Sequence, residues 1–287
     1  MLSVPEEEIV RGKRPVTRSA LVRGLRDLGI REGGVLMVHT RMSALGWVVG
    51  GSQSIVEALL EAVGPDGTLL AYVGWEDDPY HLQKWPREWQ QAYRTELPPF
   101  DPELTAADPE MGRIPERIRT WPGAKVSTGH VFRMAALGRR AEWLTADQPW
   151  EQPQGRGSPL AKLVEADGQV LMLGAPLETL TILHHAESLV ESPLRREVTF
   201  EFPIREAGRV VWRAIRDFDT SSVGAFPYEP HVPRGVDAFE VIGEAALQAG
   251  AGKRGKVGEA DSALFEARPL VRFAVGWLTE RFGGPPA

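Results

Sequence analysis

The spacing of hydrophobic residues predicts that helices and buried strands alternate near the start of the chain. An amphipathic helix is expected between an N-cap at Thr17 and a stop at Gly29. The apolar runs 35–38 and 68–73 are typical of buried strands, and the segment 52–63 between them has helical spacing. A strand, a helix and a strand in this order form a βαβ unit, which places the two strands parallel.

The middle of the chain departs from this pattern. Residues 75–125 contain four of the nine tryptophans and several prolines, which predicts an irregular, partly helical excursion from the sheet. The later pattern predicts a strand at 131–137, a helix at 159–164, a strand at 169–173, a helix at 179–191, a hairpin of 198–204 and 209–216, and helices at 236–249 and 269–281. We therefore expect a single α/β domain over 1–287, in which residues 1–14 are loosely ordered.

Composition and charge narrow the classes of function. The net charge is −6, from 33 basic and 39 acidic residues, so the basic footprint of a nucleic-acid-binding protein is missing. A mild acidic excess suits a cationic small substrate. No apolar run approaches the length of a membrane span, and residues 1–18 lack the apolar core of a secretion signal. The absence of cysteine excludes disulfides, thiolate metal sites and a cysteine nucleophile, and favours the cytoplasm.

Unusual residues follow three of the predicted strands. These segments are His39–Gly46, Gly74–Asp78 and Gly174–Pro176, the last of which leads into the helix with His184 and His185. Ligands of open α/β sheets bind outside the carboxyl ends of the strands. We therefore expect the three segments to converge on one edge of the sheet and to form the site there.

The segment 179–191 contains the best candidate for acid–base chemistry. Thr181, His184 and Glu187 are spaced three residues apart, so consecutive members of the series touch on a helix. A carboxylate beside an imidazole fixes its tautomer, as a general base near neutral pH requires. His185 lies about 100° further round the helix, so at most one of the two histidines faces a given site.

Two other interpretations fit the same residues. His184 can be a core histidine beside a solvated Glu187, as paired titratable groups often are. A metal site of His184 and Glu187 with Asp217 or Asp219 is the second alternative, although its spacing is not diagnostic.

The turn after the first strand and two groups of carboxylates are the remaining candidates. In 39–46, the backbone N–H groups and the hydroxyls of Thr40 and Ser43 can face a phosphate or carbonyl, while Gly46 allows close approach. His39 can equally be satisfied by nearby backbone. The carboxylates Glu76, Asp77, Asp78, Asp217 and Asp219 can be ordinary loop solvation or the lining of an acidic cleft for a polyamine-like substrate.

Several of these motifs together resemble the aminoglycoside 3-N-acetyltransferase family over about residues 17–282. The resemblance is to the branch found in antibiotic-producing actinomycetes and their resistance relatives. It is carried by Val38-His39-Thr40 with Ser43 and Gly46, by Ser158–Leu163, by Leu171–Pro176 continuing through Thr181–Glu187, and by Gly255–Gly258 and Leu264–Arg268.

The resemblance implies a fold, a reaction and a set of site residues. The fold is α/β with a central mixed sheet flanked by helices, and it differs from the general-control-type acetyltransferase fold. The reaction is transfer of acetyl from acetyl-CoA to the 3-amino group of 2-deoxystreptamine antibiotics such as gentamicin, which confers resistance and requires no metal. His184, Glu187 and Thr181 are the implied catalytic residues. The expected coenzyme A contacts are His39, Thr40, Arg41, Met42, Ser43, Gly46 and Ser127. The expected drug contacts, in the cleft lined by 75–125, are Tyr72, Trp75, Glu76, Asp77, Asp78, Asp217 and Asp219.

The chain departs from the family in one loop and leaves some questions open. After Ser127 the family usually reads Arg-His-Pro, whereas this chain reads Thr128-Gly129-His130. A monomer and a homodimer are both compatible with the sequence. The alternative function is a non-catalytic aminoglycoside- or coenzyme A-binding protein of the same fold, which a thiol-release assay distinguishes from the enzyme.

Overall fold

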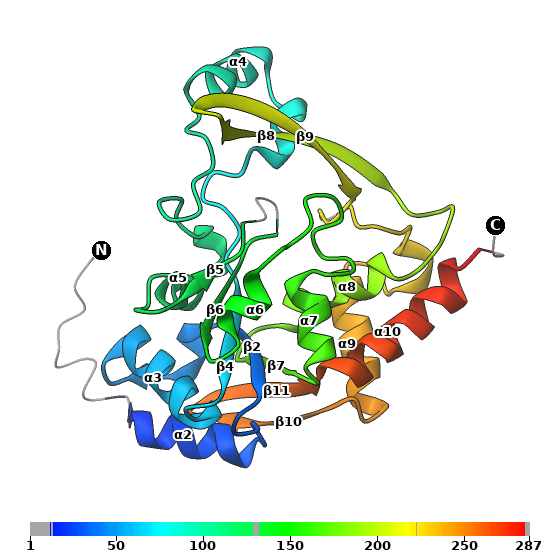
Figure 1. The fold of residues 1–287 in the computed structure, drawn as a ribbon. Helices are drawn as coiled ribbons and strands as arrows, with labels where there is room; N and C mark the ends of the chain where they lie inside the picture. Colours follow the sequence, from blue (N-terminus) through cyan, green and yellow to red (C-terminus); the bar gives the residue numbers. More distant parts are fainter. Residues whose placement is uncertain (1–11, 13, 129–131, 222, 285–287) are drawn as a thin grey trace.

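The computed structural model describes residue 12 and residues 14–128, 132–221 and 223–284. Among these residues, seven strands form one mixed sheet at the centre of the molecule (Figure 1). In order across the sheet they are β10 (Gly252–Val257), β11 (Ala260–Glu266), β7 (Gln169–Leu173), β2 (Val35–Thr40), β4 (Thr68–Tyr72), β6 (Met134–Gly138) and β5 (Lys125–Val126). β2 pairs in parallel with β4 and β7, and the outer pairs are antiparallel.

Helices cover both faces of this sheet, because side chains of the central strands alternate between two hydrophobic cores. Val35 and Met37 of β2 enter one core, and Leu36 and Val38 enter the other. The second core is covered by α2 (Arg18–Asp27), α3 (Gly51–Val63) and α5 (Arg113–Arg119). The first is covered by α6 (Ala141–Thr145), α7 (Pro159–Glu165), α8 (Ile182–Ser188), α9 (Ala238–Gln248) and α10 (Ala267–Phe282). The predicted α/β architecture is confirmed.

Local signals in the sequence determine where the first helix begins and ends. The Thr17 hydroxyl accepts a hydrogen bond from the Ala20 N–H, as expected of an N-cap. Gly29 follows the helix with a φ of 93°, a conformation that favours glycine. Ser158 caps α7 in the same way, through the Ala161 N–H.

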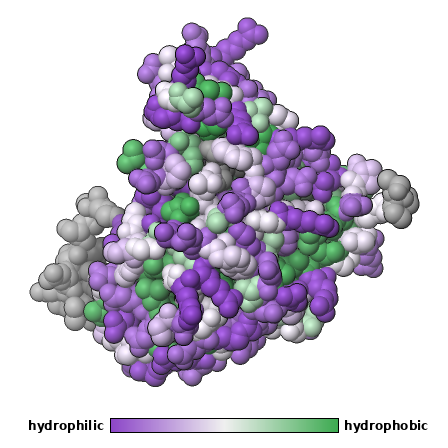
Figure 2. Space-filling model, in the orientation of Figure 1, coloured by the Kyte–Doolittle hydropathy of each residue, from purple (hydrophilic) through white to green (hydrophobic). Residues whose placement is uncertain are grey.

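The tryptophan-rich excursion and the predicted hairpin form a projection from the sheet, at the top of Figure 1. The projection contains η2 (Pro79–Lys84), α4 (Arg87–Glu96), β8 (Glu197–Glu206) and β9 (Arg209–Phe218). Its apolar core consists of Trp75, Phe100, Phe200, Phe202, Ile204 and Ile215. The surface of the molecule on this side is mostly hydrophilic (Figure 2).

Short elements complete the fold. They are β1 (Pro15–Val16) paired with β3 (Trp47–Val48), and the 3-10 turns η1 (Met42–Leu45), η3 (Pro109–Met111), η4 (Leu177–Thr179) and η5 (Glu229–His231). None of the helices in the described part of the chain is long and apolar enough to cross a membrane.

The structure differs from the predicted elements at several points. The helix expected at 179–191 is only α8, because η4 precedes it and Leu180, with a ψ of 72°, interrupts the helical path. The strands β10 and β11 were not predicted. β10 is an edge strand with Lys253, Arg254 and Lys256, so it lacks hydrophobic alternation. Most of the segment 1–14 lies outside the described residues, as does residue 131. The strand expected at 131–137 begins only at Met134, because Phe132 and Arg133 are not part of β6.

Candidate active site

The parallel strands β2, β4 and β7 are neighbours, so their carboxyl ends lie at one edge of the sheet, as predicted. The segment Gly74–Asp78, which was also expected there, does not line the cavity at this edge. A cavity of about 680 Å³ lies there. Its wall includes residues 38–42 after β2, Tyr72 at the end of β4, and Ala175 and Pro176 after β7. Thr181 and His184 line the same cavity, so the β2 turn and α8 meet on one wall.

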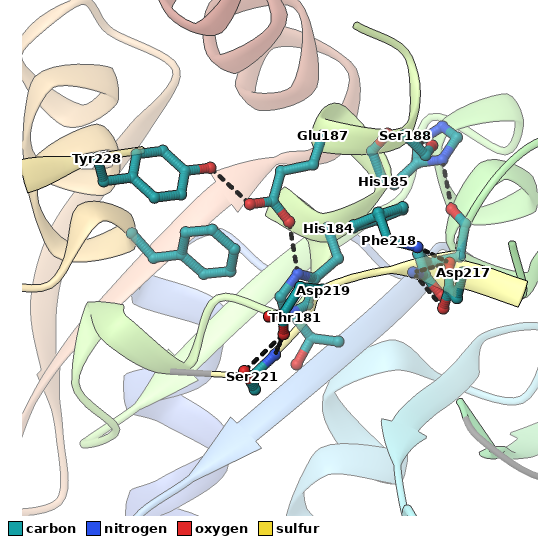
Figure 3. Close-up of polar contacts among 12 residues, drawn as sticks. Thr181, His184, His185, Glu187, Ser188, Asp217, Phe218, Asp219, Ser221 and Tyr228 are labelled. Carbon is teal, nitrogen blue, oxygen red and sulfur yellow. Dashed lines mark hydrogen bonds and ion pairs between the residues drawn. The ribbon is translucent and has the colours of Figure 1, made fainter. Parts of the chain in front are cut away.

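His184 belongs to a hydrogen-bonded unit with Glu187 and Tyr228 (Figure 3). His184 Nδ1 lies 2.6 Å from Glu187 Oε2, and the Tyr228 hydroxyl donates to Glu187 Oε1 at 2.5 Å. The Glu187 side chain is 1% exposed and that of His184 is 18% exposed. With Nδ1 donating to Glu187, Nε2 of His184 can accept a proton.

Burial and neighbouring aromatic rings fix the protonation of Tyr228 and the orientation of the His184 ring. Burial, followed by the negative charge of Glu187, raises the pKa of Tyr228 far above its usual value, so the hydroxyl stays protonated and donates. The rings of Phe132 and Phe239 lie edge-on to the His184 imidazole, with centroids 5.5 and 4.8 Å away. The imidazole is therefore fixed in position with one edge facing the cavity.

The other two candidates on this segment are placed differently. His185 is buried, and its Nδ1 donates to the backbone oxygen of Gln154 at 2.8 Å, so it faces away from the His184 cavity. Thr181 is the N-cap of α8 rather than part of a longer helix. Its hydroxyl lies 3.4 Å from the Thr179 oxygen, and it lines the cavity beside His184.

The β2 turn brings unpartnered polar atoms to the cavity wall. His39 Nε2 and Thr40 Oγ1 are buried and have no hydrogen-bond partner among the described residues. Burial lowers the pKa of His39 to about 4, so its imidazole is neutral. Unsatisfied buried polar groups are costly, which indicates a ligand that hydrogen-bonds to them. Arg41 and Met42 also line this cavity.

Three other residues expected near coenzyme A are not among the described residues that line the cavity, namely Ser43, Gly46 and Ser127. Gly46 has a φ of 85°, and a Cβ there would lie 2.6 Å from the Glu259 carboxyl carbon. Ser127 is buried, and its hydroxyl accepts from the Met134 N–H at 2.9 Å. Both positions shape the surrounding backbone.

The residues expected to contact the drug near β4 lie in two places. Tyr72 lines the His184 cavity and packs on Phe132. Glu76 and Asp77 line a separate cavity of about 930 Å³ between the excursion and the hairpin, where Trp75 is buried against aromatic rings.

Asp78 is half-buried and caps η2 through the Tyr80 N–H. Burial, supported by the charges of Asp108 and Asp77, raises the pKa of Asp78 to about 7. Its charge therefore changes close to neutral pH.

The carboxylates of the two aspartates at the end of β9 accept hydrogen bonds from other residues of the chain. Asp219 Oδ1 accepts from the N–H and the hydroxyl of Ser221, at 2.9 and 2.5 Å. Asp217 is 1% exposed, and both of its oxygens accept from the Gln154 side chain. Among the described residues, no group of three His, Asp or Glu side chains is placed to hold a metal ion, which disfavours the metal alternative.

The sequence did not predict the buried side-chain contacts made by three residues around the site, which are Tyr228, Gln154 and Arg133. Tyr228 lies 41 residues after Glu187, and no local spacing links them. Arg133 is fully buried and donates to the backbone oxygens of Gly74, Thr105 and Ala106, which holds the excursion against β6. Residues 129–131 of the atypical loop, including His130, lie outside the described residues.

Comparisons with known proteins agree on one family. The profile of the family described as aminoglycoside 3-N-acetyltransferase matches residues 37–279. The chain is 50% identical over 280 residues to aminoglycoside N(3)-acetyltransferase VIII of Streptomyces fradiae, which covers 97% of each protein.

Solved structures of similar proteins extend over the same length. The crystal structure of aminoglycoside acetyltransferase AAC(3)-Xa matches with a TM-score of 0.92 and 48% identity, covering 97% of this chain and 98% of that one. AAC-IIIb in binary complex with coenzyme A matches at 0.86 and 41% identity, covering 96% and 100%. AAC-VIa bound to sisomicin matches at 0.86 and 37% identity, covering 94% and 100%.

Proposed function

Because the chain belongs to the aminoglycoside 3-N-acetyltransferase family, it transfers acetyl to the 3-amino group of an aminoglycoside, and we propose that His184 is the general base. The observation that carries this proposal is the hydrogen-bonded unit of His184, Glu187 and Tyr228, in which the His184 side chain lines the 680 Å³ cavity. This unit leaves Nε2 of a fixed imidazole free to take a proton from the amine.

The cosubstrate is acetyl-CoA, and we place its pantetheine arm in the 680 Å³ cavity. Its amide groups would satisfy His39 Nε2 and Thr40 Oγ1, which lack partners among the described residues. Arg41 and Arg113 line the cavity and supply positive charge for phosphates, and Met42 supplies an apolar contact. Ser43, Gly46 and Ser127 act indirectly in this proposal, by setting the backbone around the arm.

The chemical step follows from this placement. An ammonium has no lone pair for attack, so the 3-amino group first loses one proton to solvent and reacts as the neutral amine. His184 Nε2 takes a second proton from this amine as its nitrogen attacks the thioester carbonyl. The C–N bond forms, the C–S bond breaks, and the imidazolium returns its proton to the departing sulfur. Negative charge develops on the carbonyl oxygen, and the Thr181 hydroxyl is the proposed donor to it.

We assign the cationic drug to the acidic side of the site. Its proposed contacts are Tyr72, Trp75, Glu76, Asp77, Asp78 and Asp219, which lie at the end of β4, in the excursion and after β9. Ionised carboxylates near the surface attract ammonium groups over about 8–10 Å at physiological ionic strength. Asp217 was expected in this group, but both of its oxygens accept hydrogen bonds from Gln154, and its role is taken up below.

We further propose that the whole chain is one domain and acts in the cytoplasm, where acetyl-CoA is available. A monomer and a homodimer remain compatible with this function. Sedimentation of the purified protein with and without coenzyme A distinguishes the two.

A thiol-release assay with acetyl-CoA and gentamicin tests the function. We expect thiol release that requires both substrates, and NMR of the product should show an acetyl group on the 3-amino nitrogen. Binding of both ligands without thiol release would instead support the non-catalytic alternative. Acetylation of a different amine would contradict the assigned regiochemistry.

A further inference from the structure

Gln154 lies in the loop between α6 and α7 and forms hydrogen bonds to both Asp217 and His185. Its side-chain Nε2 donates to Oδ1 and Oδ2 of Asp217, at 3.0 and 2.9 Å. Its backbone oxygen accepts a hydrogen bond from Nδ1 of His185 at 2.8 Å. The exposed fraction of Gln154 is 0% and that of Asp217 is 1%, so these bonds form in the low-dielectric interior, where they are strong.

These two contacts connect the catalytic helix to the hairpin. His185 follows His184 directly on α8, so its bond to Gln154 fixes the rotation of that helix about its own axis. Asp217 lies near the end of β9, on the hairpin strand that leads away from the projection. Gln154 therefore bonds both to the helix that carries His184 and to the carboxylate of Asp217. Figure 3 shows His184, His185 and Asp217 in the same close-up.

The charges around Asp217 make this arrangement relevant to the reaction. Burial raises the pKa of Asp217 to about 6, while the Gln154 amide, the Phe218 N–H and a positive charge on His184 favour the ionised form. The other titratable groups near it are Glu197 on β8, whose charge opposes ionisation, and Tyr80 on η2. Asp217 is thus ionised at neutral pH and attracts a cation at His184.

We propose that Gln154 is a positioning residue for acetyl transfer, which holds the Asp217 carboxylate and the helix of His184 in one arrangement. The carboxylate held in this way stabilises the imidazolium that forms when His184 takes the amine proton. This inference rests on the proposed role of His184. It also changes the expected role of Asp217, from a contact with the drug to a charge that acts on the base.

The test compares Gln154→Met with Gln148→Met. Gln148 lies in the same loop, is 5% exposed, and donates to two backbone oxygens, of Phe132 and Pro153, at 2.7 and 3.0 Å. Both substitutions remove hydrogen bonds of a buried amide. In the described part of the chain, the Gln154 side chain donates to Asp217, whereas the Gln148 side chain donates only to backbone oxygens. The measurements are thermal unfolding, KM for gentamicin, and kcat as a function of pH.

Different results are expected for the two variants. Gln154→Met should lower kcat about tenfold at pH 7 with little change in drug KM, since a hydrogen bond to a charged group is lost. The acid limb of its kcat profile should move up by about one pH unit, because the ionised Asp217 loses its donor. Gln148→Met should lower the melting temperature and keep the pH profile of the wild type. Identical pH profiles for the two variants would overturn the proposal.

Asp217→Asn supplies the test if Gln154→Met does not fold. It should lower kcat at pH 7 and remove the ionisation near pH 6 from the profile. A raised drug KM with unchanged kcat would place Asp217 on the drug and overturn the inference. His184→Ala tests the proposed function separately, so an inactive His184→Ala beside a normal Asp217→Asn would refute this inference alone.

Discussion

Substitution of Tyr228 by Phe tests whether the hydroxyl group supports catalysis through Glu187. The change removes one oxygen atom, whose hydrogen bond to Glu187 Oε1 is 2.5 Å long and buried. A hydrogen bond to a charged group contributes roughly 1.5–3 kcal/mol. If that energy fixes Glu187 for His184 in the transition state, kcat should fall about 10- to 100-fold. KM for the drug should change little, since Tyr228 does not act on the amine.

The assay is thiol release at saturating acetyl-CoA and gentamicin, together with urea unfolding of each variant. Tyr93→Phe is the matched control, because the Tyr93 hydroxyl donates to Asp77 at 2.7 Å on the surface. It should keep the wild-type kcat at saturating gentamicin, and any effect through Asp77, a proposed drug contact, would appear in KM instead. A Tyr228→Phe variant that loses stability but keeps full kcat would refute the reasoning and leave Tyr228 with a structural role.

Three further predictions concern the drug, the oxyanion and the fold. Gentamicin KM should rise as the pH is lowered through about 7, because the Asp78 carboxylate takes up a proton there and loses its charge. Protonation of the drug would instead lower KM, and an Asp78→Asn variant that kept the rise in KM would contradict the assignment. Thr181→Val should lower kcat about 10²–10³-fold with normal KM values, as for other oxyanion donors; a loss below about threefold would exclude it as the donor. Arg133→Met should lower the free energy of unfolding by about 3 kcal/mol or more, because three backbone oxygens lose their donor; a change under 1 kcal/mol in urea unfolding would contradict its role as a clamp.

The sequence predicted those parts of the fold that depend on local pattern. The cap at Thr17, the parallel strands β2 and β4, and the hairpin β8–β9 all follow from periodicity and turn residues close in sequence. The edge strand β10 could not be predicted in this way, because its residues are polar and its pairing with β11 supplies the order. The short α8 was likewise hidden, because a 3-10 turn of only three residues is too short for its spacing to be told from that of an α-helix.

The candidate site shows the same division. His184 and Glu187 are three residues apart, so their contact could be predicted, whereas Tyr228 is brought to Glu187 by the packing of distant segments. The comparisons confirm the family and the reaction that the motifs predicted. The roles of the individual residues stay predictions, because similarity does not measure what each side chain contributes to the rate.

The central claim is that His184 is the general base, and the kcat of His184→Ala tests it most directly. General-base removal typically costs about 10²–10⁴-fold. We expect His184→Ala to lose at least about 10²-fold in kcat at pH 7 with drug KM nearly unchanged, Glu187→Gln to fall between it and the wild type, and His185→Ala to keep most of its activity. A His184→Ala enzyme with near-normal kcat, beside an inactive His185→Ala, would contradict the account.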